Sequence, residues 1–365
     1  MTSIKILASP RTALFSDLHP FFRWKKQLSE QNIHVSIYFD HKKLKISEHD
    51  HLILHHRYFE SGWRDFSKPM SENDKTVIHY LKEVRKKGCR ILWWDAQDTS
   101  GSTGFPVIPY VDTFIKNQVL KDKTYYTSVN NRPNLRVWLD PEIEQTVFVP
   151  CPSDQLHKIK VGWNLAFNDR RYFPFKLHYY FSNITSYRIN PLKFTNVDAE
   201  RPLDLTFRGK ANYDNKFPQH NAISFQRNEV FRLLESMKFN VTYGNVVSRK
   251  QYLRELSQSK ISISPFGYGE VCYRDFETFI AGSILIKPSM EHLITFPNLF
   301  LPNETYIPVS WDLHDLQEKA EFVIANYNMH KEIAKNGQEA YRNFINSPDI
   351  FISSVKNLIN QNGQS

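Results

Sequence analysis

The chain has 365 residues, of which 41% are hydrophobic and 23% are charged. This length suits about two domains of 100–200 residues each, and the near-average composition excludes a largely disordered chain. The formal net charge is +9. A basic balance of this size favours an anionic partner, namely a nucleic acid, an acidic membrane surface or a phosphorylated ligand.

Three cysteines, Cys89, Cys151 and Cys272, are widely spaced and form no CxxC pair. This pattern argues against a disulfide framework or a zinc site and favours a reducing cytoplasm. The first residues, from Met1, enter a strand-like run without the charged and apolar regions of a signal peptide. No stretch approaches about 18 uninterrupted apolar residues, so we expect no membrane-spanning helix. We therefore expect a cytoplasmic protein; if it meets a membrane, it does so peripherally, at the inner face.

The first part of the chain alternates short apolar runs with helical patterns. Strands are predicted at Ile4–Ala8, His34–Phe39, Leu52–His55 and Arg90–Trp94, and helices at Phe21–Glu30 and Glu72–Lys87. The second helix has Ser71 as its N-cap and Gly88 as its stop. Strands that alternate with helices imply βαβ units and a parallel sheet.

The region from about Ser100 to Pro202 holds many prolines, aromatic residues and polar turns. We interpret it as loops, a few helices and a connection between domains. Regular alternation then resumes, with strands predicted at Leu203–Phe207, Phe239–Tyr243, Ile261–Ser264 and Ser283–Ile286. The helices predicted after it are Glu229–Met237, Arg249–Ser259, Arg274–Ala281, Leu313–Asn326, Lys331–Asn343 and Ile350–Asn360.

This alternation predicts an α/β fold of two Rossmann-like domains that face each other across a cleft, where ligands usually bind. We place the first domain at 1–180 and the second at 200–345. The remaining segment, 346–365, is expected to be a helix that packs back on the first domain.

The most informative segment runs from Ser259 to Pro288 as strand, turn, helix, glycine stop and strand. Its turn contains Gly267 and Gly269, and glycines at the end of a strand let the backbone approach a ligand closely. The start of the following helix offers free N–H groups and a positive dipole end to an anion. The segment therefore predicts an anion site.

Three charged residues of this segment supply the chemistry. Arg274, near the start of the helix, can bind a diphosphate through two parallel hydrogen bonds. Glu277 lies on the same helix face and can accept both hydroxyls of a ribose. Glu270 either shares that face two turns earlier or reaches further into the cleft from the loop. On spacing alone, a surface ion pair between Arg274 and Glu277 explains the pattern equally well.

The segment resembles the donor region of glycosyltransferases of the GT-B type. The spacing of Glu270 and Glu277 resembles the E-x7-E motif of many retaining members. The run from Ser259 to Gly282 resembles exostosin-like enzymes, although Thr278 stands where those sequences usually carry alanine. Residues from about 203 to 344 resemble the protein O-glucosyltransferase and capsule-associated family, which usually lacks a glutamate at the place of Glu277.

The resemblance implies a nucleotide-sugar donor, with UDP as the default nucleotide, bound in the second domain. Arg208 would oppose Arg274 across the diphosphate, with Lys210 behind it; an ordinary turn is the alternative for this pair. The other residues of the predicted donor site are Tyr243, Pro265, Phe266, Gly267, Tyr268 and Gly269. No DxD pair stands in a convincing position, so we expect no metal and no other cofactor. The arginines and the helix dipole would neutralise the leaving diphosphate.

An inverting enzyme also needs a base for the acceptor hydroxyl, whereas a retaining one can let the donor phosphate take the proton. Asp95 and Asp98 follow a predicted strand of the first domain and are our main candidates, together with Glu270. Asp17 and His19 are next. For each aspartate, a role in a turn or as an N-cap is the alternative.

These features predict a glycosyltransferase that acts on a hydroxyl of a glycan or glycolipid, in the synthesis of lipopolysaccharide, capsule or another surface polysaccharide. A catalytically silent GT-B-like protein that binds a nucleotide sugar or a glycan is the alternative. A nucleic-acid partner is not expected, because the sequence has no recognition helix, zinc finger or RNA-binding motif.

Overall fold

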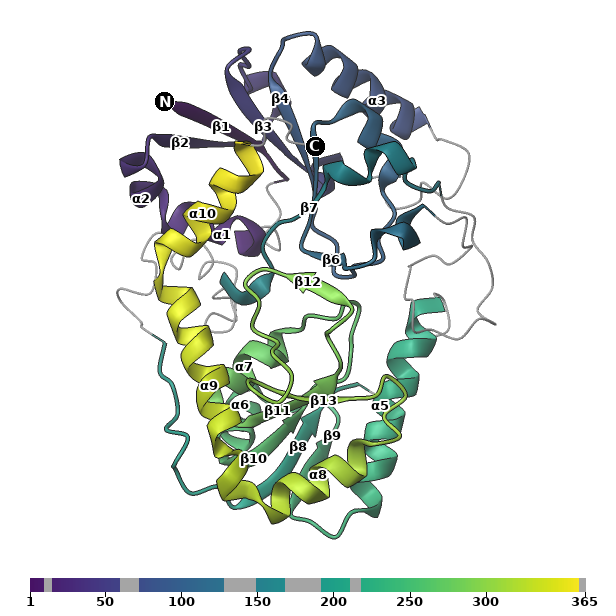
Figure 1. Ribbon diagram of the computed structural model, residues 1–365, viewed down its shortest axis with the longest axis vertical. Coiled ribbons are helices and arrows are strands. Elements are labelled where there is room, and N and C mark those ends of the chain that lie inside the picture. The colour runs from purple at the N-terminus through teal and green to yellow at the C-terminus, as the bar shows by residue number, and fades with distance from the viewer. Residues whose placement is uncertain (10–14, 60–71, 128–148, 168–191, 211–217, 361–365) are drawn as a thin grey trace.

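The structure is a computed structural model that describes residues 1–9, 15–59, 72–127, 149–167, 192–210 and 218–360 (Figure 1). Within these residues the chain forms two large parallel β-sheets, one in each half of the sequence. The predicted N-cap Ser71 and the predicted domain boundary at residue 180 lie outside the described residues.

The first sheet has six strands in the order β2-β1-β3-β4-β5-β7, and all neighbouring strands run parallel. Their bounds are β1 (Thr2–Leu7), β2 (Ile33–Tyr38), β3 (Asp50–His55), β4 (Arg90–Asp95), β5 (Thr113–Lys116) and β7 (Ile159–Val161). The central strand β4 is buried from Ile91 to its end, as expected for a parallel strand that is covered on both faces.

The second sheet has five parallel strands in the order β13-β11-β10-β8-β9. Their bounds are β8 (Leu203–Arg208), β9 (Val241–Gly244), β10 (Ser259–Ile263), β11 (Ile284–Pro288) and β13 (Ile307–Val309). Two parallel sheets linked by helices confirm the predicted α/β fold of two Rossmann-like domains.

Helices connect the strands of both sheets. The first half contains α1 (Phe15–Arg23), α2 (Lys25–Glu30) and α3 (Glu72–Arg85). The second half contains α5 (Pro218–Ser236), α6 (Arg249–Gln258), α7 (Tyr273–Ala281), α8 (Leu316–Ala325), α9 (Tyr327–Asn346) and α10 (Pro348–Ile359). Among the described residues, no helix is both long enough and apolar enough to cross a membrane.

The last helix returns to the first domain. Figure 1 shows α9 and α10 in yellow, running from the second sheet up to the first. Phe351 and Val355 of α10 are buried in one cluster with Phe21 and Trp163 of the first domain. Arg90 of β4 donates a hydrogen bond to the carbonyl of Ile359 at 2.9 Å. The first domain is therefore completed by the end of the chain.

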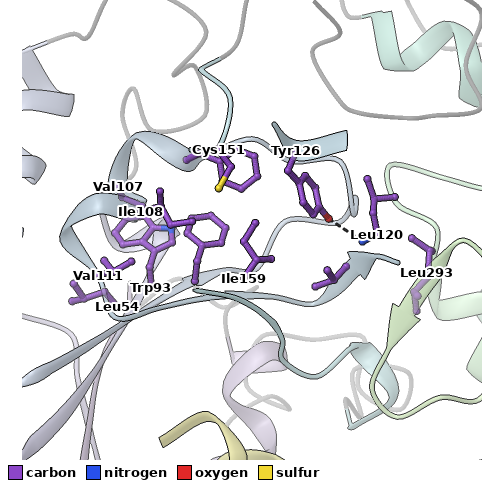
Figure 2. Packing of buried hydrophobic residues seen from close by; sticks show 14 of the residues in the cluster. Leu54, Trp93, Val107, Ile108, Val111, Leu120, Tyr126, Cys151, Ile159 and Leu293 are labelled. Carbon is purple, nitrogen blue, oxygen red and sulfur yellow. Dashed lines mark hydrogen bonds between the residues drawn. The ribbon is translucent and has the colours of Figure 1, made fainter. Parts of the chain in front are cut away.

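The two domains share a continuous interface. The short strand β6 (Gln118–Leu120) of the first half pairs antiparallel with β12 (Leu293–Thr295) of the second. Figure 2 shows Leu293 beside Leu120, at one end of a buried cluster that continues through Ile159 to Trp93. The relative position of the domains is thus set by a β-ladder and a common hydrophobic core.

The structure differs from the sequence prediction in several places, two of them in the first half of the chain. In the second half, the helix predicted at Glu229–Met237 begins earlier, as α5, and the short strands β12 and β13 were not predicted. The predicted helix Phe21–Glu30 is two helices that break at Trp24, whose ψ of 25° lies outside the helical region. The segment that we interpreted as loops and helices contains the strands β5, β6 and β7. Each of them has three or four residues, almost all buried, which is too short for a periodic pattern.

Candidate functional site

The carboxyl ends of the two sheets meet where the loop after β4 contacts the loop after β10. A Cβ added to Gly269, in the loop after β10, would lie 1.6 Å from the carbonyl oxygen of Asp98, in the loop after β4. Real Cβ atoms essentially never come within 3.0 Å of another heavy atom, so only glycine fits. Gly269 therefore serves the contact between the domains.

The start of α7 is held by a buried polar network. The carboxylate of Asp275 accepts hydrogen bonds from the N–H of Cys272 at 2.9 Å and from the hydroxyl of Ser264 at 2.6 Å. It also pairs with the ammonium of Lys287 at 2.6 Å, and both side chains are fully buried. The helix ends at Gly282, whose φ of 65° is the left-handed conformation typical of a C-cap. These contacts fix the helix that carries the predicted donor residues.

Arg274 on α7 is anchored by a backbone carbonyl and an aromatic ring within its own domain. Its Nη2 donates to the backbone carbonyl of Arg208, and its guanidinium lies 4.7 Å from the ring centre of Phe207. Among the described residues, no carboxylate pairs with Arg274, and its buried Nε has no hydrogen-bond partner. The Arg274–Glu277 ion pair of the alternative is not among the ion pairs of the described residues, and the anion site at Arg274 stays a prediction.

Glu277 lies one turn along α7 and is 8% exposed. Its Oε2 accepts a hydrogen bond from the hydroxyl of Tyr252 at 2.8 Å, and its Oε1 lies 3.8 Å from Nη1 of Arg249. Burial and the neighbouring Glu277 raise the pKa of Tyr252 well above its usual value, so the phenol stays a donor. Six residues separate Glu270 from Glu277, one fewer than in E-x7-E.

The guanidinium of Arg208, at the end of β8, is hydrogen-bonded to other residues of the same domain. Its Nε and Nη2 donate to the two carboxylate oxygens of Glu255 at 2.7 and 2.8 Å, and its Nη1 donates to the carbonyl of Tyr243. The Arg208 guanidinium in turn holds the pKa of Glu255 below its usual value. The charge of Arg208 is thus paired with Glu255, a residue that the sequence analysis did not single out. A contact between Arg208 and a diphosphate stays a prediction.

Arg227 on α5 is a second guanidinium near Arg274, and sequence analysis missed it. A Cβ added to Gly209 would lie 3.5 Å from Nη2 of Arg274 and 3.7 Å from Nη1 of Arg227. The Nη1 of Arg227 also donates to the carbonyl of Lys210 at 2.9 Å. Arg227 follows Gln226, whose side chain accepts the N–H of Phe266 at 2.8 Å; no local sequence pattern signals either contact.

The remaining predicted donor residues line the same turns. Pro265 and Phe266 are buried, whereas Tyr268 is 47% exposed. The N–H of Gly267 donates to the carbonyl of Gly269 at 3.0 Å, which closes the turn. Lys210 is exposed beyond the end of β8 and Tyr243 is half-buried at the end of β9.

Glu270 bonds to the first domain. Its carboxylate is 1% exposed. It accepts hydrogen bonds from the hydroxyls of Thr99 and Ser100 at 3.3 and 2.9 Å, from the Ser100 N–H at 3.0 Å and from the Gln118 amide at 3.2 Å. The carboxylate thus joins the loop after β10 to the loop after β4.

The two aspartates at the end of β4 and in the loop after it, Asp95 and Asp98, differ in how far they are buried. Asp95 is 2% exposed and pairs with the ammonium of Lys116 at 3.0 Å, beside the hydroxyl of Ser102. Asp98 is exposed, and its carbonyl accepts a hydrogen bond from the side chain of Gln118. Of the two, only Asp98 is exposed, and it lies next to Gly269 of the loop after β10.

A histidine that sequence analysis missed accompanies Asp17. The Nε2 of His55, at the end of β3, lies 3.1 Å from Oδ2 of Asp17, and both residues are buried. The Nδ1 of His55 accepts the N–H of Arg57 at 3.3 Å, so both ring nitrogens are engaged. His19 is 1% exposed. Among the described residues, no group of three or more His, Cys, Asp or Glu side chains is placed to hold a metal ion.

No family model matches the chain. A segment of 78 residues is 36% identical to human protein O-glucosyltransferase 1, covering 21% of this chain and 20% of that protein. The rat protein O-glucosyltransferase 1 matches to the same extent. The chain thus matches these curated relatives over about a fifth of their length.

Several solved structures are similar over most of the chain at low identity. An alpha-glucosyltransferase in complex with UDP has a TM-score of 0.46 and 10% identity, covering 98% of this chain and 100% of its own. T4 phage BGT in complex with UDP-glucose has a TM-score of 0.45 and 10% identity, covering 99% and 100%. TarM has a TM-score of 0.46 and 10% identity, covering 88% of this chain and 56% of its own. The topology of the two parallel sheets establishes the α/β fold without these similarities.

Proposed function

We propose that the chain is a glycosyltransferase that moves a sugar from a nucleotide-sugar donor, by default a UDP-sugar, to a hydroxyl of a glycan or glycolipid. One observation carries this proposal: beside Gly209, Arg274 presents a guanidinium that pairs with no carboxylate of the described residues, one helical turn from the carboxylate of Glu277. A guanidinium suits a diphosphate and a carboxylate suits the ribose hydroxyls. The 78-residue similarity to protein O-glucosyltransferase 1 supports the same class of reaction.

The transfer forms a bond between the acceptor oxygen and the anomeric carbon as the bond to the diphosphate breaks. Negative charge then develops on the leaving diphosphate. Arg274 and the N-terminus of α7 stabilise that charge, because fixed positive groups aimed at developing charge lower the barrier. The chain needs no metal ion for this step.

The acceptor proton goes to Asp98. This aspartate is exposed, and its backbone touches Gly269 of the donor loop, which supports a position between donor and acceptor. Asp95 and Glu270 are buried and engaged, so both act as positioning residues that hold the Asp98 loop.

The net charge of the chain supports the proposed acceptor and the proposed location at a membrane surface. A net charge of +9 favours an anionic, lipid-linked glycan acceptor that is met at the inner face of a membrane. On this proposal the protein works in the cytoplasm, in the synthesis of a lipopolysaccharide, capsule or other surface polysaccharide.

Calorimetric titration of UDP, GDP and CMP into the wild type and Arg274→Ala tests the donor site. We expect micromolar binding of one nucleotide by the wild type and its loss in the variant, because the guanidinium holds the phosphates. Binding that is unchanged in Arg274→Ala would show that the phosphates lie elsewhere. No binding of any nucleotide by the wild type would contradict the proposed donor class.

A catalytically silent protein that only binds the nucleotide sugar or a glycan is the second candidate. It is favoured by the engagement of Asp95 and Glu270 in buried contacts, which leaves Asp98 to carry the base function. Nucleotide binding without any release of the nucleotide from its sugar, with every acceptor offered, would select this candidate.

A further inference from the structure

Two aromatic side chains, Phe225 of α5 and Trp311 in the segment after β13, are stacked on each other. Their ring centres lie 5.5 Å apart and their planes are 12° from parallel. Phe225 is 46% exposed and Trp311 is half-buried. We call this pair the aromatic platform. Because β10 and β13 belong to one parallel sheet, their carboxyl ends lie at one edge, so the platform shares an edge with the proposed donor site.

The platform is tied to the loop after β10 through a buried amide. Gln226 is 1% exposed; its Oε1 accepts the N–H of Phe266 at 2.8 Å and its Nε2 donates to the carbonyl of Trp311 at 2.7 Å. Figure 1 shows the segment between β13 and α8 passing beside α5. Both rings are therefore held in place next to the loop that carries the proposed donor residues.

The turn that carries Trp311 has a costly backbone conformation. Leu313 has a φ of 65° and is fully buried, although the left-handed region is unfavourable for a bulky side chain. Its N–H donates to the carbonyl of Ser310 at 3.1 Å, and the N–H of Ser310 donates to the carboxylate of Asp315 at 2.8 Å. Strained residues of this kind cluster at ligand-binding segments, which points to a function for the position of Trp311.

A polar pair directly follows Trp311. Asp312 and His314 are both exposed. The Oδ1 of Asp312 accepts the N–H of His314 at 3.3 Å and lies 2.7 Å from its Nδ1. The hydrogen bond from His314 lowers the pKa of Asp312, and the same bond raises the pKa of His314. Both contacts use Oδ1, so among the described residues the Oδ2 of a charged carboxylate remains for a hydroxyl group.

A sugar ring matches this combination of groups. The C–H groups of a pyranose form an apolar face that is attracted to the negative face of an aromatic ring, and its hydroxyls need acceptors such as a carboxylate. An anionic membrane surface would be repelled by the carboxylate of Asp312. A second copy of the chain would need an interface of roughly 800 Å² on each partner, far more than two rings offer.

We propose that Phe225 and Trp311 bind a sugar ring of the acceptor glycan by stacking, beside the loop after β10. This inference rests on the proposed function. It assigns part of the acceptor recognition to the second domain. It also requires an acceptor that contains a sugar ring, which excludes a hydroxyl of a protein side chain or of a lipid without sugar.

Surface plasmon resonance on the immobilised full chain tests the platform. The probes are purified lipopolysaccharide core and capsular oligosaccharides, with maltohexaose and chitohexaose as neutral glycans. Phe225→Ala and Trp311→Ala should each weaken binding of the preferred oligosaccharide roughly tenfold or more, because large aromatic side chains dominate such contacts. Phe225→Tyr keeps a ring and should keep the affinity. Phe322→Ala is the matched control, since Phe322 is a 60% exposed phenylalanine of α8.

Nucleotide calorimetry on the same variants separates this inference from the proposed function, and thermal melting checks that each variant is folded. Nucleotide affinity should stay within twofold of the wild type. Unchanged oligosaccharide affinity in both alanine variants, or no oligosaccharide bound by the wild type, would overturn the inference and leave the donor site intact. Loss of nucleotide affinity in the alanine variants would place the platform in the donor site and overturn the inference as well. Failure of the wild type to bind any nucleotide would overturn the proposed function and this inference together.

Discussion

Asp98 is the residue on which the proposed catalysis depends. We expect Asp98→Asn to lower kcat by roughly 10²- to 10⁴-fold, the usual contribution of a general base. Nucleotide affinity should stay unchanged, because Arg274 and Glu277 lie in the other domain. Rates of nucleotide release and calorimetric titrations measure the two quantities separately.

A control for this substitution is Asp349→Asn, which changes an exposed aspartate in the first turn of α10. Full turnover in Asp98→Asn would contradict the assignment and leave two explanations. Either the reaction retains configuration and the donor phosphate takes the proton, or Asp17 beside His55 is the base. Asp17→Asn, measured in the same assay, separates them.

At the scale of elements, Arg201 joins the ends of α6 and α7 to the sheet. Its guanidinium donates to the carbonyls of Ser257 and Ser259 at 3.0 Å each and of Ala281 at 2.9 Å. Arg201 is 5% exposed, and burial lowers its pKa below the usual value. It satisfies carbonyls at two helix ends, where a positive charge is favourable. The helix that carries Arg274 is therefore held at its far end too.

We expect Arg201→Met to lower the free energy of unfolding by about 3 kcal/mol, because it leaves several buried carbonyls without donors. Arg201→Lys should recover only part of the loss, since lysine lacks the planar fork. Urea denaturation measures both, with Arg254→Met, an exposed arginine of α6, as the control. A loss below about 0.5 kcal/mol, the range of ordinary surface substitutions, would contradict this role.

The elements with a clear periodic pattern were predictable from sequence, and the contacts between them were not. Strands such as β4 and helices such as α7 carry enough apolar residues and glycine stops to be recognised. The strands β5, β6 and β7 have too few residues for a pattern. The side chain of Gln226 accepts the N–H of Phe266, a contact across 40 positions of sequence that no local pattern signals.

At the scale of the whole molecule, the proposed donor and acceptor sides are aligned by direct contact between the two domains. The carboxylate of Glu270 bonds to Thr99, Ser100 and Gln118, and β6 pairs with β12. Transfer needs Asp98 at a fixed distance from a donor held by Arg274. The interface therefore supplies the alignment that the proposed chemistry needs, and misalignment should affect transfer more than donor binding.

Gly269→Ala tests this alignment directly. The new Cβ would lie 1.6 Å from the carbonyl oxygen and 2.3 Å from the carbonyl carbon of Asp98, so the two loops must separate. We expect transfer to fall at least roughly a hundredfold, as a displacement of about 1 Å can cause. Nucleotide affinity should change little, because Arg274 is anchored to Arg208 within its own domain. Turnover and calorimetry measure the two effects.

Gly104→Ala is the control for this substitution, since its Cβ would meet only the ring of Phe114 at an ordinary 3.8 Å. Solution X-ray scattering of both variants reports whether the domains move apart, and we expect a larger radius of gyration only for Gly269→Ala. If transfer and nucleotide affinity fell by the same factor in that variant, Gly269 would belong to the donor site itself. The close approach to Asp98 would then shape the nucleotide pocket, and domain alignment would rest on Glu270, the β6–β12 ladder and the shared hydrophobic core.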